Sequence, residues 1–216
     1  MNAPAAVPSE TRARVIDATI QCILEEGFYR ASSNRIAKHA GVTWGVIQHH
    51  FGTREALLVA VFQEGMRELI DTLESAVIAG DTFEARLESL ADVIWRFYRV
   101  PRFVAYEQLA LNLLRDPTMD AATVRLVRRQ QAKIGELLTE LAARVVGSDT
   151  EVLPPAALLQ ILRGLAIGLV LAEAVPGRAR RARVDPPVNE DERQVLVAAL
   201  AALVRSARDR GPMSES

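Results

Sequence analysis

The sequence predicts an all-α protein with two helical domains, and three observations support that fold class. Apolar side chains recur at spacings of three and four residues along most of the 216 positions, which is the period of an amphipathic helix. Strand-like alternation is almost absent, and aromatic residues make up only 5% of the chain. With 50% hydrophobic residues, the chain is long enough for two cores. We therefore expect an N-terminal three-helix helix-turn-helix domain at residues 9–54 and a larger helical domain at residues 55–210.

The first helix is expected to begin at a capping residue, Ser9 or Thr11, and to end at Glu26, because Gly27 suits a helix C-terminus. Its apolar residues are more numerous than one helix face requires, so we expect two of its sides to be covered. Cys22 lies within this apolar stretch and is interpreted as a small buried hydrophobe. It is the single cysteine, which excludes an internal disulfide.

The next stretch, residues 32–55, predicts two short helices joined at a tight corner. The hydroxyl of Ser32 can cap the first helix, and Gly41 can end it in the left-handed conformation. Thr43 can then cap the second helix. Three residues are expected to give that helix its apolar face: Val46, Ile47 and Phe51. Two such helices around a glycine turn form a helix-turn-helix, whose second helix enters the major groove in DNA-binding proteins. A three-helix bundle that binds nothing is the alternative.

Six further helices are expected along the rest of the chain. Glycine or proline marks their ends at Gly80, Pro101, Pro117 and Gly147. The expected spans are 54–79, 83–99, 103–114, 118–146, 155–173 and 190–208. The first of these starts in the helix-turn-helix domain and continues into the next domain, which makes it the natural connector. Apolar groups surround nearly the whole circumference of the helix at 155–173, so we expect one side to be covered from outside its own domain.

A set of residues between positions 11 and 58 carries a resemblance to a known family. They are Gly27-Phe28, Ser32, Ile36-Ala37, Ala40-Gly41-Val42-Thr43, Gly45, His50-Phe51, Thr53-Arg54-Glu55 and Leu57-Leu58. In these residues the chain resembles the N-terminal domain of the TetR family of bacterial transcriptional regulators. The resemblance implies binding to double-stranded operator DNA as a dimer, and an all-helical C-terminal domain that usually holds a small molecule. Gln48 stands where the family commonly has tyrosine, and Arg54 where it usually has lysine.

The predicted DNA-binding residues lie around the second helix of the motif. They are Ser32, Arg35, Thr43, Trp44, Gly45, Gln48, His49, His50 and Arg54. We expect Thr43, Trp44, Gln48 and His49 to face the groove, where the amide of Gln48 can match the edge of adenine or reach a phosphate. Ser32, Thr43, His50 and Arg54 suit phosphates. The charge distribution agrees with DNA binding by the N-terminal residues. Residues 1–54 carry six basic and four acidic side chains, whereas the rest of the chain carries twenty basic and twenty-three acidic side chains.

Five of the eleven aromatic residues fall between positions 95 and 106, around Pro101. Aromatic side chains with a few polar groups nearby are typical of a small-molecule pocket, although a solid core has the same composition. The predicted ligand-binding residues are Met66, Trp95, Tyr98, Phe103, Tyr106, Glu107 and Asn112.

The two C-terminal helices are expected to form the dimer interface, because their apolar surface is too large for a monomer to expose. Two helices from each of two chains would close a four-helix interface, as the resemblance also implies. The predicted interface residues are Leu158, Ile161, Leu165, Gly168, Leu196, Leu200 and Leu203.

Taken together, these features predict a cytoplasmic homodimeric DNA-binding regulator, in the form of a repressor that a small apolar or amphipathic effector releases from its operator. No uncharged apolar run is long enough to cross a membrane. We expect no enzymatic activity, no cofactor and no metal, because the chain has one cysteine and all three histidines fall before residue 55. Two alternatives remain: a regulator without a small-molecule ligand, and an all-helical enzyme or lipid carrier that merely contains a similar bundle.

Overall fold

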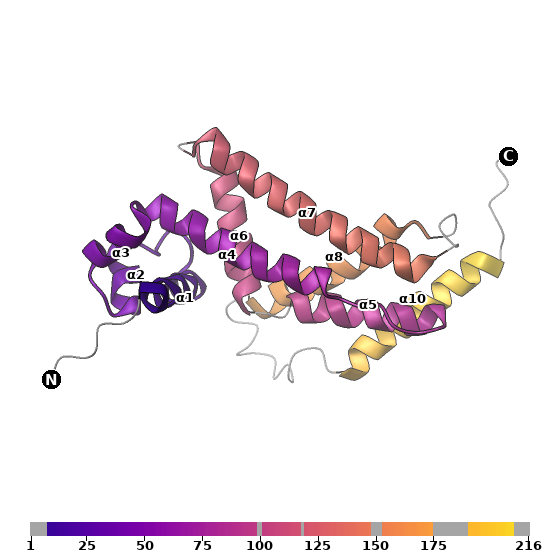
Figure 1. Ribbon diagram of the computed structural model, residues 1–216. Helices are drawn as coiled ribbons and strands as arrows, with labels where there is room; N and C mark the ends of the chain where they lie inside the picture. Colours follow the sequence, from indigo (N-terminus) through magenta and orange to yellow (C-terminus); the bar gives the residue numbers. More distant parts are fainter. Residues whose placement is uncertain (1–7, 99–100, 118, 148–152, 175–189, 210–216) are drawn as a thin grey trace. The chain divides into compact units, whose positions relative to one another are not determined.

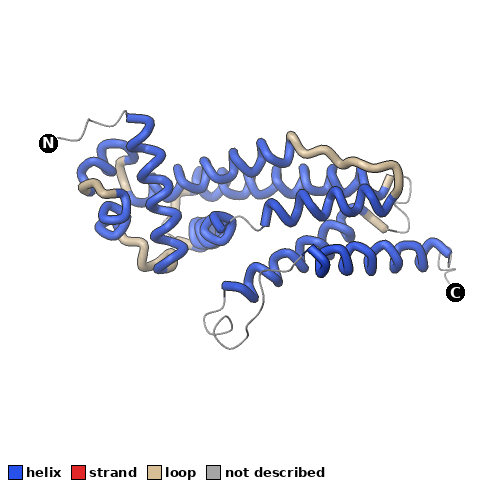
Figure 2. Tube along the Cα trace, turned by 90° about the horizontal axis from the view of Figure 1, so that it is seen from below, coloured by secondary structure: helices blue, strands red, loops and turns tan. Residues whose placement is uncertain are grey.

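The computed structural model describes residues 8–98, 101–117, 119–147, 153–174 and 190–209, and every regular element in them is a helix (Figure 2). The helices are α1 (Pro8–Glu26), α2 (Ser33–Ala40), α3 (Trp44–Phe51), α4 (Arg54–Glu74), α5 (Phe83–Tyr98), α6 (Pro101–Arg115), α7 (Ala121–Val146), α8 (Pro155–Ala174) and α10 (Glu190–Asp209). The predicted all-α fold class is confirmed.

The chain divides into two compact units whose boundaries differ from those expected. Unit 1 comprises residues 1–69 and 100–131, and unit 2 comprises residues 70–99 and 132–216. The boundary expected between residues 54 and 55 falls inside unit 1. The physical reason is that α6 packs against α1, so the helix-turn-helix shares its core with a helix far along the sequence.

Unit 1 is built around α1, which packs against α2 on one side and α6 on another. Figure 1 shows α1, α2 and α3 grouped near the N-terminus, with α2 packed on α3. The core consists of fully buried side chains from four helices: Val15, Ile20, Ile23, Ile36, Ile47, Leu57 and Phe62. The excess of apolar residues on α1 therefore has the predicted cause, since two of its sides are covered.

The helix-turn-helix corner has the predicted stop and one of its two predicted caps. Gly41 adopts the left-handed conformation (φ 65°, ψ 31°), and its N–H donates to the carbonyl of Lys38. Thr43 caps α3, because its Oγ1 accepts a hydrogen bond from the N–H of Val46 at 3.4 Å. Ser32 occupies the N-cap position of α2 in an extended conformation, but its side chain makes no capping hydrogen bond. Its predicted capping role is corrected accordingly.

The end of α4 and the start of α6 also depart from the sequence prediction. Helix α4 ends at Glu74 instead of residue 79, because the segment after it is tied to α5: the N–H of Ala79 donates to Oγ of Ser89 at 3.1 Å. Gly80 follows with φ 117°, a conformation that glycine adopts without strain. Pro101 is the first residue of α6 and not only a break, which fits a residue that lacks an N–H.

In unit 2, α5 packs against both α8 and α10. The buried side chains include Leu87, Leu90, Ile94, Leu138, Leu141, Leu158 and Val204. The guanidinium of Arg86 donates to the carbonyl of Val145 at 3.2 Å and so satisfies a carbonyl at the end of α7. Lys133 and Glu74 form an ion pair at 3.3 Å. None of the described helices is long and apolar enough to cross a membrane.

Candidate nucleic-acid interface

Helix α3 is attached to unit 1 by one fully buried side chain, that of Ile47. Phe51 is half-buried and Val46 is 37% exposed, so the apolar face predicted for this helix is narrower than expected. Gln48 and His49 are exposed. A short helix that is anchored on one side and polar on the other has the form required to enter the major groove.

The start of α3 leaves room for close approach by another molecule. Gly45 is exposed, and a Cβ added there would meet only Oγ1 of Thr43, at 3.7 Å. Packing against α2 therefore does not require glycine at this position. Thr43 is exposed and its hydroxyl hydrogen is available to a further acceptor, since the oxygen accepts from Val46. Trp44 is half-buried.

The two histidines of α3 lie edge to face, with ring centroids 5.6 Å apart. The ring of His50 also lies 6.4 Å from the ring of Phe51 and is half-buried, so His50 packs beside that aromatic ring. His49 is exposed. Of the pair, His49 is therefore the freer to contact another molecule.

Arg54 is held by the main chain of the loop before α2. Its Nε donates to the carbonyl of Ala31 at 3.1 Å, and Nη2 donates to the carbonyl of Phe28 at 3.3 Å. The guanidinium carbon also lies 5.5 Å from the centroid of the Phe28 ring, in a cation–π contact. The sequence predicted a phosphate contact for this residue. The structure gives Arg54 an internal partner set that the sequence did not reveal.

The remaining predicted residues lie on α2 and at its start. Ser32 and Arg35 are exposed, and Arg35 forms an ion pair with Glu26 of α1. Tyr29, which the sequence analysis passed over, is 86% exposed and lies edge to face with Phe28. A solvent-exposed tyrosine in the loop before a helix-turn-helix is a candidate contact residue, because its ring and hydroxyl serve both apolar and polar surfaces.

Cys22 has the buried position predicted for it, with no exposed surface. Burial raises the pKa of its thiol above the ordinary value, and the nearby positive charge of Arg35 partly offsets that rise.

The predicted ligand-binding residues do not fall in one compact unit. Met66 of α4 and the α6 residues Phe103, Tyr106, Glu107 and Asn112 belong to unit 1, whereas Trp95 and Tyr98 belong to unit 2. Four of the seven are buried, namely Met66, Tyr98, Phe103 and Tyr106. The amide of Asn112 donates to the carbonyl of Gln108 one turn earlier, at 2.7 Å. A pocket lined by these residues stays a prediction.

Helix α6 is joined to the helix-turn-helix by polar contacts. Arg102 pairs with Asp17 of α1 at 2.8 Å, and Oε1 of Gln108 accepts from the N–H of Phe28 at 3.2 Å. A third contact is apolar: the ring of Tyr106 lies against Gly65 of α4, where an added Cβ would be 2.3 Å from it. Burial raises the pKa of the Tyr106 phenol, and the charge of Glu68 adds to the rise.

The predicted dimer residues divide into buried and exposed groups. Leu158 is fully buried and Leu200 is 8% exposed, so both belong to the core of unit 2, which corrects their assignment to a surface. Ile161 and Gly168 are exposed. Val195 of α10, which was not among the predicted interface residues, is 66% exposed. The side chains of Leu165, Leu196 and Leu203 lie outside the described residues.

Comparison with known proteins identifies the N-terminal segment. Residues 15–61 match the family described as "Bacterial regulatory proteins, tetR family". The HTH-type transcriptional regulator BetI 2 of Chromohalobacter salexigens is 43% identical over 68 residues, which cover 32% of this chain and 31% of that protein. BetI of Burkholderia thailandensis is 28% identical over 172 residues, covering 77% and 83%. The matched segment spans between about a third and a half of the first curated relatives.

Solved structures show the same fold along most of the chain. The transcriptional regulator FadR from Bacillus subtilis in complex with stearoyl-CoA has a TM-score of 0.57 at 19% identity, covering 90% of this chain and 98% of that one. The curated relatives are named as regulators and not as enzymes, which agrees with the predicted absence of enzymatic activity. The N-terminal segment of the chain, residues 15–61, is therefore similar to the TetR family of bacterial regulatory proteins.

Proposed function

We propose that the chain is a homodimeric DNA-binding transcriptional regulator whose α3 reads operator DNA in the major groove. The observation that carries this proposal is that Ile47 is the one fully buried side chain of α3, while Gln48 and His49 are exposed beside the open surface at Gly45. Because Gly45 has no side chain, the backbone of α3 can approach the DNA closely and the helix can enter the major groove deeply.

The contacts divide by chemistry. Trp44, Gln48 and His49 are assigned to base edges, since side chains of the first turns of a recognition helix reach them. Thr43, Ser32 and His50 are assigned to phosphates, because their donors position a protein without reading sequence. Arg35 contributes positive charge to the same surface. These assignments rest on position and exposure within unit 1.

We further propose that a small apolar or amphipathic effector releases the protein from its operator. The connections of α6 support this idea, because a displacement of α6 would act on α1 through Arg102 and Asp17 and on the loop before α2 through Gln108 and Phe28. Such an effector acts by population shift: it must bind better to the state that does not fit DNA. The stearoyl-CoA of the Bacillus subtilis FadR complex belongs to the amphipathic class.

A second candidate, a regulator without a small-molecule effector, also has an observation in its favour. Tyr106 is buried and its ring lies against Gly65, an arrangement in which the aromatic residue is packed as core. In that case the α6 contacts only stabilise the helix-turn-helix.

The experiment begins with selection of bound duplexes from a random pool, followed by fluorescence anisotropy on the selected sequence. We expect a two-fold-related sequence bound with a Kd of about 10⁻⁸–10⁻¹¹ M. Gln48→Ala should weaken binding to the selected sequence. Gln63→Ala, a substitution of an exposed residue on α4, should not. Addition of stearoyl-CoA then separates the candidates: release supports an amphipathic effector, and unchanged affinity with this and related acyl compounds favours the regulator without one. Failure to enrich any sequence would contradict DNA recognition itself.

A further inference from the structure

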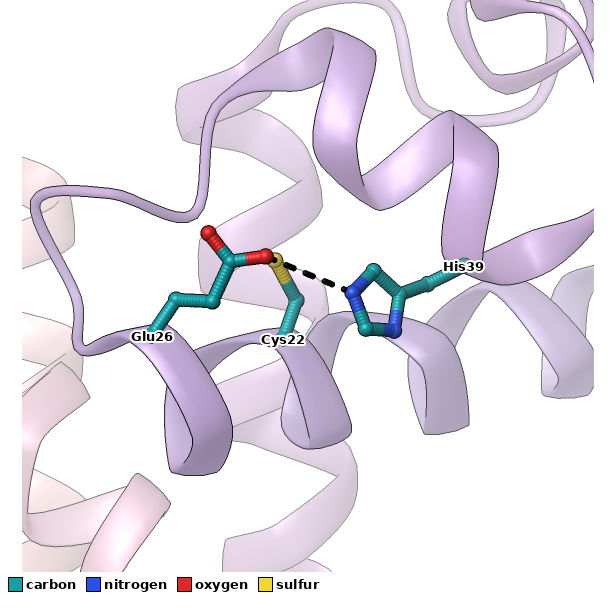
Figure 3. Close-up of side chains that lie close together, drawn as sticks. All are labelled: Cys22, Glu26 and His39. Atoms are coloured by element: carbon teal, nitrogen blue, oxygen red, sulfur yellow. Dashed lines mark ion pairs between the residues drawn. The ribbon is translucent and has the colours of Figure 1, made fainter.

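Three metal-ligating side chains meet where α1 packs on α2. Cys22 and Glu26 lie four residues apart on α1, so they project from the same face. His39 comes from the last turn of α2. Figure 3 shows the thiol and the carboxylate turned toward the imidazole. One ligand atom from each of the three residues lies within 4.8 Å of the other two.

The distances suit a small divalent cation. Nε2 of His39 and Oε1 of Glu26 are 3.5 Å apart. A tetrahedral zinc ion with bonds of about 2.0–2.2 Å to nitrogen and oxygen holds those two ligands about 3.3–3.6 Å from each other. The sulfur lies within 4.8 Å of both atoms, and a tetrahedral zinc ion would hold it about 3.6 Å from each, so it must approach them by up to about 1.2 Å.

The charges of the set also fit. A thiolate, a carboxylate and a neutral imidazole give a divalent cation a site of zero net charge, with sulfur and nitrogen ligands that select zinc over magnesium or calcium. Arg35 pairs with Oε2 of Glu26, which leaves Oε1 facing His39. Arg35 would thus orient the ligating carboxylate from the outer shell. A water can complete four ligands.

Cys22 supplies an independent observation. Its side chain is fully buried, and no hydrogen-bond partner of its thiol occurs among the residues that the structure describes. The thiol nevertheless faces two polar groups, the imidazole of His39 and the carboxylate of Glu26. The route for an ion lies on the other side of the cluster, where the side chains of Glu26 and His39 are 19% and 26% exposed.

We propose that Cys22, Glu26 and His39 form a zinc site that links α1 to α2 inside the DNA-binding unit. Binding forms a bond from the metal to each of the three ligand atoms and releases the thiol proton to water. The ion would fix α2, and with it the corner that carries α3, against the first helix. The site is independent of the proposed effector and would exist whether or not the protein answers to one.

The test uses the full-length chain, freed of metal with a chelator and titrated with Co²⁺ as a spectroscopic probe for zinc. Because Cys22 is the single cysteine, a thiolate-to-cobalt charge-transfer band can arise from no other residue. We expect that band with one equivalent of Co²⁺, and its loss when Zn²⁺ is added. Zn²⁺ at a hundredfold excess over its Kd should raise Tm by about 5–10 °C.

Two variants and one control decide the outcome. Cys22→Ser should abolish the band, and His39→Ala, at a partly exposed position that the fold tolerates, should weaken Co²⁺ binding at least about 100-fold. His49→Ala, an exposed histidine outside the cluster, should leave both band and Tm shift intact. The proposal is overturned if Co²⁺ gives no charge-transfer band, or if His39→Ala binds Zn²⁺ as tightly as the parent. The cluster would then be an ion pair beside a buried thiol.

Discussion

Nε of Arg54 donates a hydrogen bond to the carbonyl oxygen of Ala31 across 3.1 Å, and this bond ties the start of α4 to the loop before α2. Nη2 of the same guanidinium bonds the carbonyl of Phe28. Two main-chain carbonyls at the entrance to the helix-turn-helix thus depend on one side chain. Arg54, whose phosphate contact stays a prediction, is also part of the framework that positions the DNA-binding helices, and the two roles lead to different outcomes on substitution.

Arg54→Ala should therefore lower the free energy of unfolding by about 2–3 kcal/mol, because hydrogen bonds from a charged donor to partly buried carbonyls are lost. Urea denaturation measures the change. Arg30→Ala is the matched control, since the side chain of Arg30 is exposed on the same loop, and it should stay within about 0.5 kcal/mol of the parent. If Arg54→Ala instead kept the parental stability but bound every DNA more weakly, the main role of Arg54 would be phosphate contact.

Gly65→Ala should destabilise the protein by about 1–3 kcal/mol, because the added Cβ would meet the buried ring of Tyr106 at 2.3 Å. Gly135→Ala is the control within a helix. No atom lies within 4 Å of a Cβ at that position, so the substitution should stabilise by about 0.5–1 kcal/mol through helix propensity. Thermal unfolding of both variants checks the contrast. Equal behaviour of the two would show that Tyr106 moves aside without cost.

The dimer prediction now rests on exposed residues of α8 and α10. Ile161→Glu and Val195→Glu should shift the protein from dimer to monomer in light scattering while helix content stays unchanged, because each residue is more than half exposed within its own chain. Leu200→Glu should instead lower stability, since that residue is buried in unit 2. A persistent dimer in both exposed variants would place the interface elsewhere.

Local chemistry accounts for what could be predicted from the sequence. The left-handed Gly41 and the Thr43 cap involve residues within four positions of their partners, so the sequence pattern contains them. The spacing of apolar residues likewise indicated most helix spans to within a few residues.

Contacts between distant residues account for what could not. Arg54 reaches carbonyls 23 and 26 residues away, and Arg102 meets Asp17 across 85 positions. Neither contact produces a periodic pattern in the sequence. For the same reason the proximity of Cys22 and His39 could not be predicted, since the two residues come from different helices.

Trp44 offers the most direct test of the central claim that α3 reads sequence. It follows the Thr43 cap, in the first turn of the helix, and it is half-buried, so that part of the indole can pack against a thymine methyl or a sugar. The measurement is a salt titration of binding to the selected operator and to a scrambled duplex, for the parent and for Trp44→Ala. We predict that Trp44→Ala costs about 1–3 kcal/mol on the operator, little on the scrambled duplex, and leaves the salt slope unchanged. Equal weakening on both duplexes, or unfolding of the variant, would contradict this account and make the indole a packing residue.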